Sequence, residues 1–469
     1  MTYKSQNEKF NNERRKILMT AGTLGAGVLF ASQLPLLTGI ANAMPAPEGK
    51  YYSENMEMLG YHDLKGRPGF QMAMQIVDGR YYLYMGSFAH QGWTIIEVTD
   101  PENPTNHTWL PYPGNKKGTV CPKIQIADGI MITTVQKGLP VYHGSPKNAK
   151  HDGGIFIWDV REPLKPKLLS QWDSGYGSGT HRSFYNGGRY VHLSSTAAGF
   201  NGHIYRILDI SNPKKPFEAG RWWLPDQWAA GGANHKSGAS LHGAPYVKGN
   251  LVYISYGKAG MVIVDISNIE TPQFVGQLDT HPPLGDTAPQ MHTVVPLSQR
   301  PYAVITSEGR RPAAWSKEKI GDHIPSVNFI GMADVRNPAE PTLVSIFPTP
   351  IPPADAPYKN FSELENIGAF GFGPHNLHQP ENHPALEDRN DRIYCTYFNA
   401  GLRIYDISDP YLPKEIASFI PPDPKEFAFN KKGFPGPKLA TVEDVLVDNR
   451  GIIYMTSMNQ GLWILRCTV

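Results

Sequence analysis

The stretch Gly260-Met-Val-Ile-Val-Asp265 decides the fold, because close copies of it recur along the chain. Copies with the same internal spacing are Gly92-Trp-Thr-Ile-Ile-Glu97, Gly154-Ile-Phe-Ile-Trp-Asp159 and Gly401-Leu-Arg-Ile-Tyr-Asp406. Looser copies are Ile204-Tyr-Arg-Ile-Leu-Asp209 and Phe329-Ile-Gly-Met-Ala-Asp334, and a seventh copy is Gly461-Leu-Trp-Ile-Leu-Arg466. The acidic residue therefore recurs at positions 97, 159, 209, 265, 334 and 406. Such a period indicates repeated supersecondary units rather than separate domains.

Each copy of the motif is preceded by a hairpin and followed by a turn. A β-rich segment with a tight turn lies before the motif, for example Tyr246-Val-Lys-Gly-Asn-Leu-Val-Tyr253. After the acidic residue comes a turn with proline, as in Ser408-Asp409-Pro410. Each unit is thus predicted to form four short antiparallel strands, A to D. The repeating Asp is expected to accept backbone hydrogen bonds in the turn between strands C and D. Four-stranded units in radial repetition predict a β-propeller.

The two ends of the chain complete the last unit. The seventh motif, at Gly461, lies so close to the C-terminus that no strand D follows it. Met56-Glu-Met-Leu-Gly-Tyr-His-Asp63 resembles strand D of the other units. Pairing of this segment with residues 461–469 would remove two sheet edges. The sequence therefore predicts an all-β fold, a seven-bladed β-propeller closed by its N-terminal strand, as a single domain over residues 44–469.

The repeated motif resembles that of the LVIVD-repeat family, which is named after the pattern seen here as Met261-Val-Ile-Val-Asp265. The resemblance covers residues 50–469 and implies a propeller architecture. It implies no particular chemistry, so the function has to be argued from the residues of this chain.

The N-terminal residues 1–43 have the features of a targeting segment. Arg14 and Arg15 precede an uncharged run, rich in Gly and Ala, that ends in the small-residue cleavage signal Ala41-Asn42-Ala43. Paired arginines before a weakly hydrophobic run resemble a twin-arginine export signal. The sequence predicts recognition by the twin-arginine export machinery, cleavage and a periplasmic protein. A permanent membrane anchor is the alternative, because the run is long enough to span.

The charge of the mature chain argues against nucleic acid or a membrane surface as a partner. The whole chain has 44 basic and 42 acidic side chains, and residues 1–43 contain five basic and two acidic ones. The remainder has 44 − 5 = 39 basic and 42 − 2 = 40 acidic residues, a net charge of −1. No basic field or polybasic patch is present to attract phosphate groups. A small-molecule substrate is the expected partner.

Histidine recurs at one structural position in four consecutive units. Counting back eleven residues from a fixed point of strand B leads to the start of strand A, the innermost strand. The count leads to His181, His242 and Glu443 in units three, four and seven. The matching strands of units five and six begin at His292 and His375. In the sixth unit the register leaves His378 as an alternative to His375. Because strands A line the channel, their first residues are expected to converge on the axis at one face.

Four converging imidazoles predict a transition-metal centre, since this ligand set suits iron, copper or zinc better than calcium. Iron is the favoured ion, with copper or manganese as alternatives and zinc less favoured, because a protein folded before export can take up its metal in the cytoplasm. Such a centre would be similar in geometry to the iron site of the carotenoid-cleavage oxygenases and to copper thiol oxidases of the selenium-binding-protein family. The alternative is a set of separate polar residues around a wet channel.

Long insertions fall in the connections on the face where the histidines are expected to open. Segments 308–327 and 350–373 belong to this group. Loops gathered over one face of a rigid scaffold typically form a binding site. The candidate substrate-pocket residues are His90, Arg310, Trp315 and Phe372, and the candidate catalytic carboxylates are Glu308 and Glu443. Either carboxylate could bind the metal, orient a histidine or move protons.

These observations predict a periplasmic metalloenzyme. The expected activity is that of an oxidoreductase acting on a small, largely apolar or aromatic organic substrate. A metal-dependent lyase or hydrolase at the same site is the first alternative. A non-enzymatic propeller that binds partners or serves as a scaffold is the second, and it predicts no stoichiometric metal.

Overall fold

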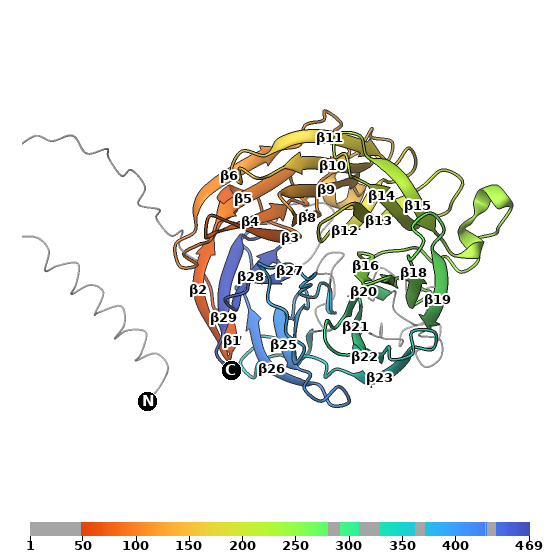
Figure 1. Cartoon of the computed structure of the whole chain (residues 1–469). Coiled ribbons are helices and arrows are strands. Elements are labelled where there is room, and N and C mark those ends of the chain that lie inside the picture. Colours follow the sequence, from red (N-terminus) through yellow and green to blue (C-terminus); the bar gives the residue numbers. More distant parts are fainter. Residues whose placement is uncertain (1–47, 280–290, 309–327, 362–370, 427, 429–437) are drawn as a thin grey trace, which may run out of the picture. The chain divides into compact units, whose positions relative to one another are not determined.

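The structure, a computed structural model, describes residues 48–279, 291–308, 328–361, 371–426, 428 and 438–469. The predicted export signal, residues 1–43, lies outside the described residues. Seven antiparallel sheets stand around a central axis, as Figure 1 shows. The prediction of an all-β, seven-bladed propeller is therefore confirmed.

The first three blades follow the predicted order of strands A to D from the axis outward. Blade one consists of β3 (Met72–Val77), β4 (Arg80–Gly86), β5 (Gly92–Glu97) and β6 (Thr105–Pro111). Blade two consists of β7 (Thr119–Val120), β8 (Ile124–Ala127), β9 (Ile130–Lys137), β10 (Gly154–Asp159) and β11 (Lys167–Asp173), where β7 and β8 share the place of strand A. Blade three consists of β12 (Thr180–Phe184), β13 (Tyr190–Thr196), β14 (His203–Asp209) and β15 (Phe217–Trp222).

The remaining blades keep the pattern, except at the inner edge of blade six. There, among the described residues, a single bridge between Leu377 and Cys395 stands in the place of strand A. Blade four consists of β16 (Tyr246–Lys248), β17 (Leu251–Ser255), β18 (Met261–Asp265) and β19 (Gln273–Leu278). Blade five consists of β20 (Met291–Pro296), β21 (Tyr302–Ser307), β22 (Ile330–Asp334) and β23 (Thr342–Ile346). Blade six contains β24 (Arg392–Thr396), β25 (Leu402–Asp406) and β26 (Lys414–Ile420), and blade seven contains β27 (Val442–Val447), β28 (Ile452–Ser457) and β29 (Leu462–Cys467).

Short helical segments connect some strands. The α-helix α2 (Pro140–His143) lies between β9 and β10. Three turns of 3-10 helix are η1 (Leu64–Gly66), η2 (Pro225–Gln227) and η3 (Ala229–Gly231). Among the described residues, no helix has both the length and the apolar character that crossing a membrane requires.

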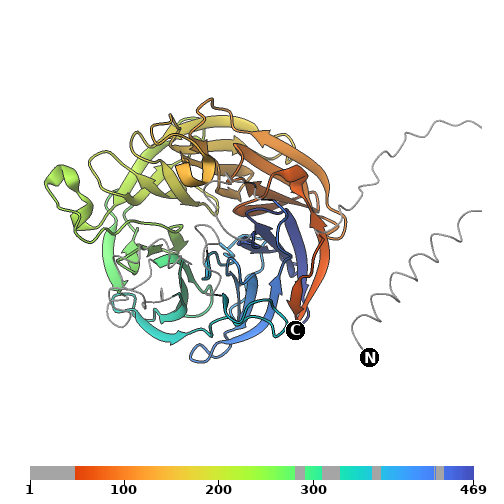
Figure 2. The ribbon, with the colours of Figure 1, turned by 180° about the vertical axis from the view of Figure 1, so that it is seen from behind.

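The N-terminal strands close the ring. Strand β2 (Met56–His62) pairs with β29, as predicted, and becomes the outermost strand of blade seven. Strand β1 (Tyr52–Glu54), which the sequence analysis did not predict, adds a further strand to β26 of blade six. In Figures 1 and 2 these first strands, in red, lie beside the last strands of the chain, in blue. The closing segment thus covers the outer edges of two blades.

The repeating acidic residue organises the turn after strand C, as predicted. An Oδ1 atom of Asp265 accepts a hydrogen bond from the N–H of Ser267 at 2.6 Å, and Asp406 accepts one from Ser408 at 2.8 Å. The same bond to the residue two positions on is made by Asp159, Asp209 and Asp334. This Asx-turn satisfies a backbone N–H donor at the end of the strand. The acidic residue therefore recurs at the same place in the repeated motif for a structural reason.

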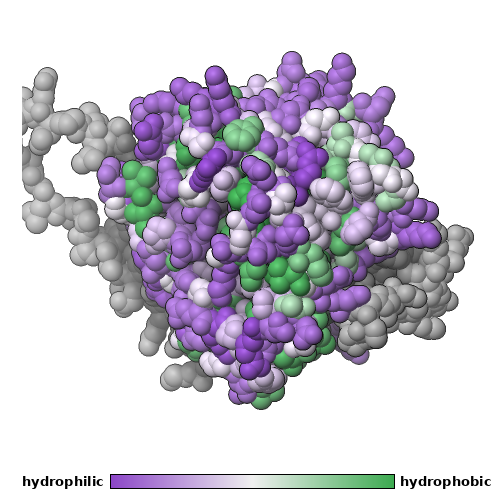
Figure 3. All heavy atoms as spheres, turned by 45° about the vertical axis from the view of Figure 1, so that its right-hand side comes forward, coloured by the Kyte–Doolittle hydropathy of each residue, from purple (hydrophilic) through white to green (hydrophobic). Residues whose placement is uncertain are grey.

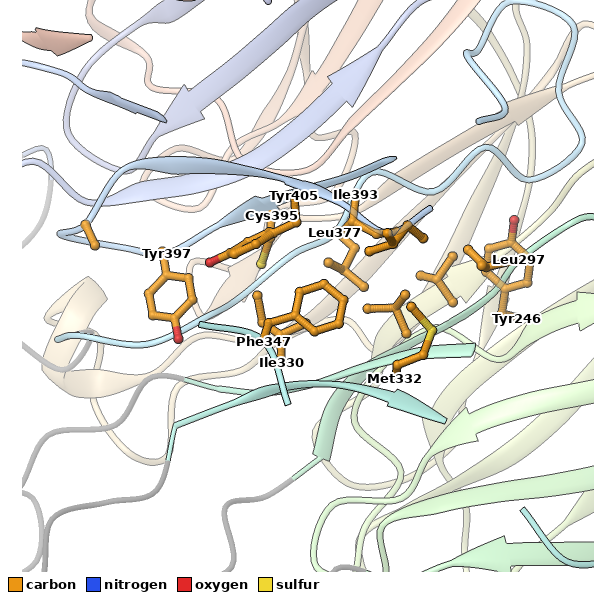
Figure 4. Packing of buried hydrophobic residues seen from close by; sticks show 14 of the residues in the cluster. Tyr246, Leu297, Ile330, Met332, Phe347, Leu377, Ile393, Cys395, Tyr397 and Tyr405 are labelled. Atoms are coloured by element: carbon orange, nitrogen blue, oxygen red, sulfur yellow. The ribbon is translucent and has the colours of Figure 1, made fainter. Parts of the chain in front are cut away.

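The core lies between blades, where buried faces of neighbouring sheets pack together. Strand β18 is typical, because Met261, Val262, Ile263 and Val264 are all buried, on both faces of the sheet. Figure 4 shows one such layer, in which side chains of blades five and six meet. The outer surface seen in Figure 3 is mostly hydrophilic, with small apolar patches. Packing on both faces therefore holds the blades rigidly and fixes where their inner ends lie.

Candidate metal centre

A β-bulge turns the predicted residue toward the axis in three blades. In blade three Thr180 pairs with Ser195 and Arg182 with Ser194, so His181 is the extra residue between them. The same shift of register occurs in blade five at His292 and in blade seven at Glu443. Bulges re-aim side chains and are frequent next to functional sites. The repeated bulge explains why residues from separate blades point to one place.

Hydroxyl groups of strand B hold these inner ends in position. The Ser255 hydroxyl of blade four donates a hydrogen bond to the carbonyl of His292 in blade five, at 2.8 Å. In the same way Thr306 donates to the His375 carbonyl (3.3 Å), and Thr396 donates to the Glu443 carbonyl (3.0 Å). Each blade therefore fixes the backbone of the candidate residue of the next blade.

The four predicted histidines come together. Ring centroids are 4.6 Å apart for His181 and His242, 4.8 Å for His242 and His292, and 4.4 Å for His292 and His375. His378 lies outside this row: its Nε2 contacts the Glu387 carbonyl at 2.7 Å, and its Nδ1 accepts a bond from a backbone N–H. The structure therefore places His375, not His378, in the cluster. The set His181, His242, His292 and His375 is called the histidine cluster below.

The Nδ1 atoms of three of these rings are held by oxygen acceptors. His292 Nδ1 lies 3.1 Å from the His375 carbonyl, and His375 Nδ1 lies 2.9 Å from the Glu443 carbonyl. His181 Nδ1 lies 2.9 Å from the side-chain oxygen of Gln136. Because a carbonyl oxygen can only accept, Nδ1 carries the proton and Nε2 keeps its lone pair. Histidines that bind metals are oriented by this kind of bond.

Burial keeps the imidazoles neutral. The pKa values of His181, His292 and His375 lie well below the usual value, first because burial disfavours the charged form and then because positively charged neighbours and other histidines surround them. A neutral imidazole offers a lone pair at neutral pH, so these rings are in the state that binds a metal.

Two carboxylates, Glu308 and Glu443, approach the cluster from different sides. Glu308 Oε2 lies 3.6 Å from His242 Nε2, and one ligand atom from each of His242, His292 and Glu308 falls within 4.8 Å of the others. Glu443 is 0% exposed, and neither of its carboxylate oxygens has a hydrogen-bond partner among the described residues. Burial raises the pKa of Glu443 well above its usual value. A buried carboxyl without a hydrogen bond beside neutral imidazoles fits a site for a cation.

Two buried basic side chains that the sequence analysis did not consider also lie at the cluster. The Arg182 Nη2 atom donates to His292 Nε2 (3.1 Å) and to the side-chain oxygen of Asn376 (2.7 Å). Lys123 Nζ lies 3.9 Å from Glu443 Oε1 and 3.9 Å from the centre of the Phe70 ring. A metal on His292 Nε2 would have to displace the Arg182 contact. Lys123 could have been found from the sequence, because a lysine at the start of the apolar segment Lys123-Ile-Gln-Ile126 is unusual.

One aromatic side chain, Phe398, packs against the histidine cluster. The Phe398 ring stacks on His375, with centroids 4.5 Å apart and an angle of 28° between the planes. Phe398 is fully buried and has a φ of +44°, which is rare for a bulky side chain. Such strain tends to gather at functional sites. Phe398 therefore fixes the orientation of His375 from the face, while Glu443 fixes it from the edge.

Of the predicted substrate-pocket residues, the structure describes His90 and Phe372. Phe372 packs against Phe361 (5.7 Å between centroids) and Tyr397 (5.3 Å) in the core between blades five and six. The backbone N–H of His90 donates to the Ser87 hydroxyl, in the turn between β4 and β5. Arg310 and Trp315 lie outside the described residues. The composition of loops alone does not reveal which aromatic side chains pack in the core.

A small cavity of about 30 Å³ lies between the inner strands of blades one, two and seven and the segment 377–386, and Glu381 and Asp444 are in its lining. Glu381 is buried, and its backbone N–H donates to the Tyr246 hydroxyl at 2.8 Å. Burial raises the pKa of Glu381 to about 8 and that of Asp444 to about 6. Glu381 therefore carries its proton at neutral pH.

Replacing Glu381 by glutamine is expected to stabilise the protein progressively as the pH rises. The folded-state pKa of about 8 lies above the unfolded value of 4.5, so the folded protein binds the extra proton and loses stability as pH rises between these values. The loss is about 1.4 kcal/mol for each pH unit. Urea unfolding between pH 5 and 8 should show the variant gaining on the wild type with rising pH. A constant difference would contradict a buried, protonated Glu381.

The family comparison agrees with the repeats seen in the sequence and the structure. The model of the LVIVD repeat matches residues 200–222, 246–280 and 392–420. No curated protein sequence matches the chain. Among solved structures, the chain is similar to the computationally designed Ika8 protein (11% identity over 86% of this chain and 98% of that one, TM-score 0.43). It is also similar to the β-propeller domain of Cps50 (Swd1) from Myceliophteria thermophila (10% identity, 88% and 100% coverage, TM-score 0.49). The matched repeats and the seven sheets described above together show that this chain is a seven-bladed β-propeller that contains LVIVD repeats.

Proposed function

We propose that the protein is a periplasmic metalloenzyme, an oxidoreductase that acts on a small, largely apolar or aromatic organic substrate at the histidine cluster. One observation carries the proposal: Nδ1 of three clustered rings is held by an oxygen acceptor, so Nε2 is the nitrogen that keeps its lone pair, and at His292 that lone pair accepts the Arg182 hydrogen bond. Lone pairs that share a buried space repel one another unless a cation lies between them. Orienting bonds of this kind accompany metal ligands in proteins.

The proposed ligands are His181, His242, His292 and His375, for one transition-metal ion. Iron is the preferred ion, with copper or manganese next and zinc less favoured, and a redox metal would supply electron transfer with the substrate. Glu308 is the proposed proton carrier, because it contacts His242 at 3.6 Å and lies at the partly exposed side of the cluster. Glu443 holds the His375 ring through its carbonyl, so it is a positioning residue in this proposal.

The twin-arginine segment supports the proposed location. Arg14 and Arg15 stand before the uncharged run, in the arrangement typical of proteins exported in a folded state. Folding before export would let the chain acquire its metal in the cytoplasm, where the supply of copper and zinc ions is more restricted.

Elemental analysis of the mature protein, purified without chelator and without added metal, tests the proposal. We expect about one equivalent of iron, copper or manganese per chain. Zinc alone would favour a hydrolase or lyase at the same site. A folded protein with no bound metal, and none taken up after dialysis against Fe²⁺, Mn²⁺ or Cu²⁺, would contradict the metalloenzyme and favour a propeller that binds a partner.

A further inference from the structure

Arg182 differs from the other buried arginines of the described structure. Arg206 is 6% exposed and forms an ion pair with Glu218, and Arg403 is 3% exposed and forms one with Glu415 at 2.8 Å. Arg182 is 1% exposed, and no carboxylate of the described residues lies within 4.0 Å of its guanidinium. An arginine keeps its charge in proteins. A buried charge without a counter-charge is costly, so a position of this kind calls for an explanation.

The hydrogen bonds of Arg182 go to neutral groups. Its Nη2 atom donates to the His292 imidazole and to the Asn376 amide oxygen, and its Nε–H has no partner among the described residues. The side chain leaves blade three and reaches blades five and six, so it crosses the channel at the level of the histidine cluster. A fork of donors, partly unused and directed at the proposed metal position, matches the geometry of a carboxylate.

The other charges around Arg182 do not neutralise it by direct contact. Glu443 and Asp444 of blade seven and Glu308 of blade five act on the guanidinium at longer range. Lys123, from blade two, places a second buried basic side chain beside Glu443, and burial lowers the pKa of this lysine to about 7. Arg182 and Lys123 belong to different blades, and they share this space with the three carboxylates.

We propose that Arg182 binds the carboxylate of an organic anion, so that the substrate of the centre is a carboxylic acid in its ionised form. This inference rests on the proposed function for the catalytic role of the site, although the anion subsite itself needs only Arg182. The carboxylate would replace the contacts of the guanidinium with His292 and Asn376, and it would supply the missing counter-charge. The uncharged part of the substrate would then extend toward the partly exposed side, where His242 and Glu308 lie.

Binding of benzoate, acetate and formate to the wild type and to an Arg182→Met variant tests the inference, with benzamide as the uncharged analogue of benzoate. By titration calorimetry we expect at least one carboxylate to bind the wild type, benzamide to fail, and the variant to lose at least tenfold in affinity. The matched control is Arg403→Met, which removes an equally buried arginine far along the chain. It should lower Tm by breaking its pair with Glu415, yet bind carboxylate as the wild type does.

Measuring Tm and metal content distinguishes loss of the anion subsite from unfolding and from loss of the metal. Arg182→Met should keep its metal and unfold at a temperature no lower than the wild type, because an unpaired charge is removed. Equal carboxylate affinity in the wild type and Arg182→Met, or no carboxylate binding to the wild type, would overturn the inference. A metal-free wild type that still binds carboxylate through Arg182 would refute the proposed function while leaving the anion subsite in place.

Discussion

Replacing His292 by alanine is expected to lower the metal affinity of the protein by a factor of about 100 or more. His292 stands in the middle of the cluster, with ring centroids 4.8 Å from His242 and 4.4 Å from His375, and it belongs to the group formed with Glu308. Loss of a residue that only orients a ligand already reduces metal affinity 10- to 100-fold. Loss of a ligand should exceed that range, and competition with a chromophoric chelator measures it.

The matched control for His292→Ala is His192→Gln. His192 is a buried histidine of blade three whose Nδ1 bonds the Tyr205 hydroxyl at 2.6 Å, away from the cluster. We expect this variant to keep the wild-type metal affinity. Wild-type affinity in a folded His292→Ala protein would show that the metal, if bound, lies elsewhere. Equal losses in both variants would indicate a general effect of destabilisation.

Replacing Tyr61 by alanine is expected to destabilise the ring by about 3 to 5 kcal/mol, the range for removing a large buried aromatic side chain. Tyr61 lies on β2, is 8% exposed and packs against Trp463 with ring centroids 4.7 Å apart. Its hydroxyl accepts a hydrogen bond from the N–H of Gly461 at 3.0 Å. Strand β2 covers the edge of β29 and so joins the two ends of the chain. Weaker packing of β2 would therefore expose that edge more often. Urea unfolding followed by tryptophan fluorescence measures the change.

Tyr61→Phe separates packing from hydrogen bonding in the closing strand. It keeps the ring against Trp463 and removes only the bond to Gly461, so a loss of about 1 kcal/mol is expected. If Tyr61→Ala were as stable as the wild type, the pairing of β2 with β29 would contribute little, and the propeller would not depend on its N-terminal strand.

Positions within a hairpin could be predicted from the sequence because the register of a tight turn is fixed. Asp78 and Gly79 both have positive φ, 51° and 73°, as a two-residue turn between paired strands requires. Counting back from strand B across such a turn led to His242. The same count reached His181, although five residues, 185–189, join β12 and β13. The same count back from strand B led to Glu443. Because the blades share one architecture, its side chain was expected to point toward the propeller axis.

Positions that depend on contacts between blades could not be predicted in this way. The bulge at His181 changes which neighbours face the channel, and Arg182 contacts Asn376 only because blades three and six meet across the axis. Which nitrogen of His375 carries the proton depends on the Glu443 carbonyl, 68 positions away. Strand β1 was missed for a similar reason, since its partner β26 lies at the far end of the chain.

Diffraction data collected at the absorption edge of the bound metal would test the central claim most directly. We expect one anomalous peak on the propeller axis, at about 2.0–2.3 Å from Nε2 atoms of the histidine cluster, with Nδ1 of His292 and His375 still bonded to the neighbouring carbonyls. An ordered, fully described cluster with no anomalous peak, in crystals grown with Fe²⁺, Mn²⁺ or Cu²⁺, would contradict it.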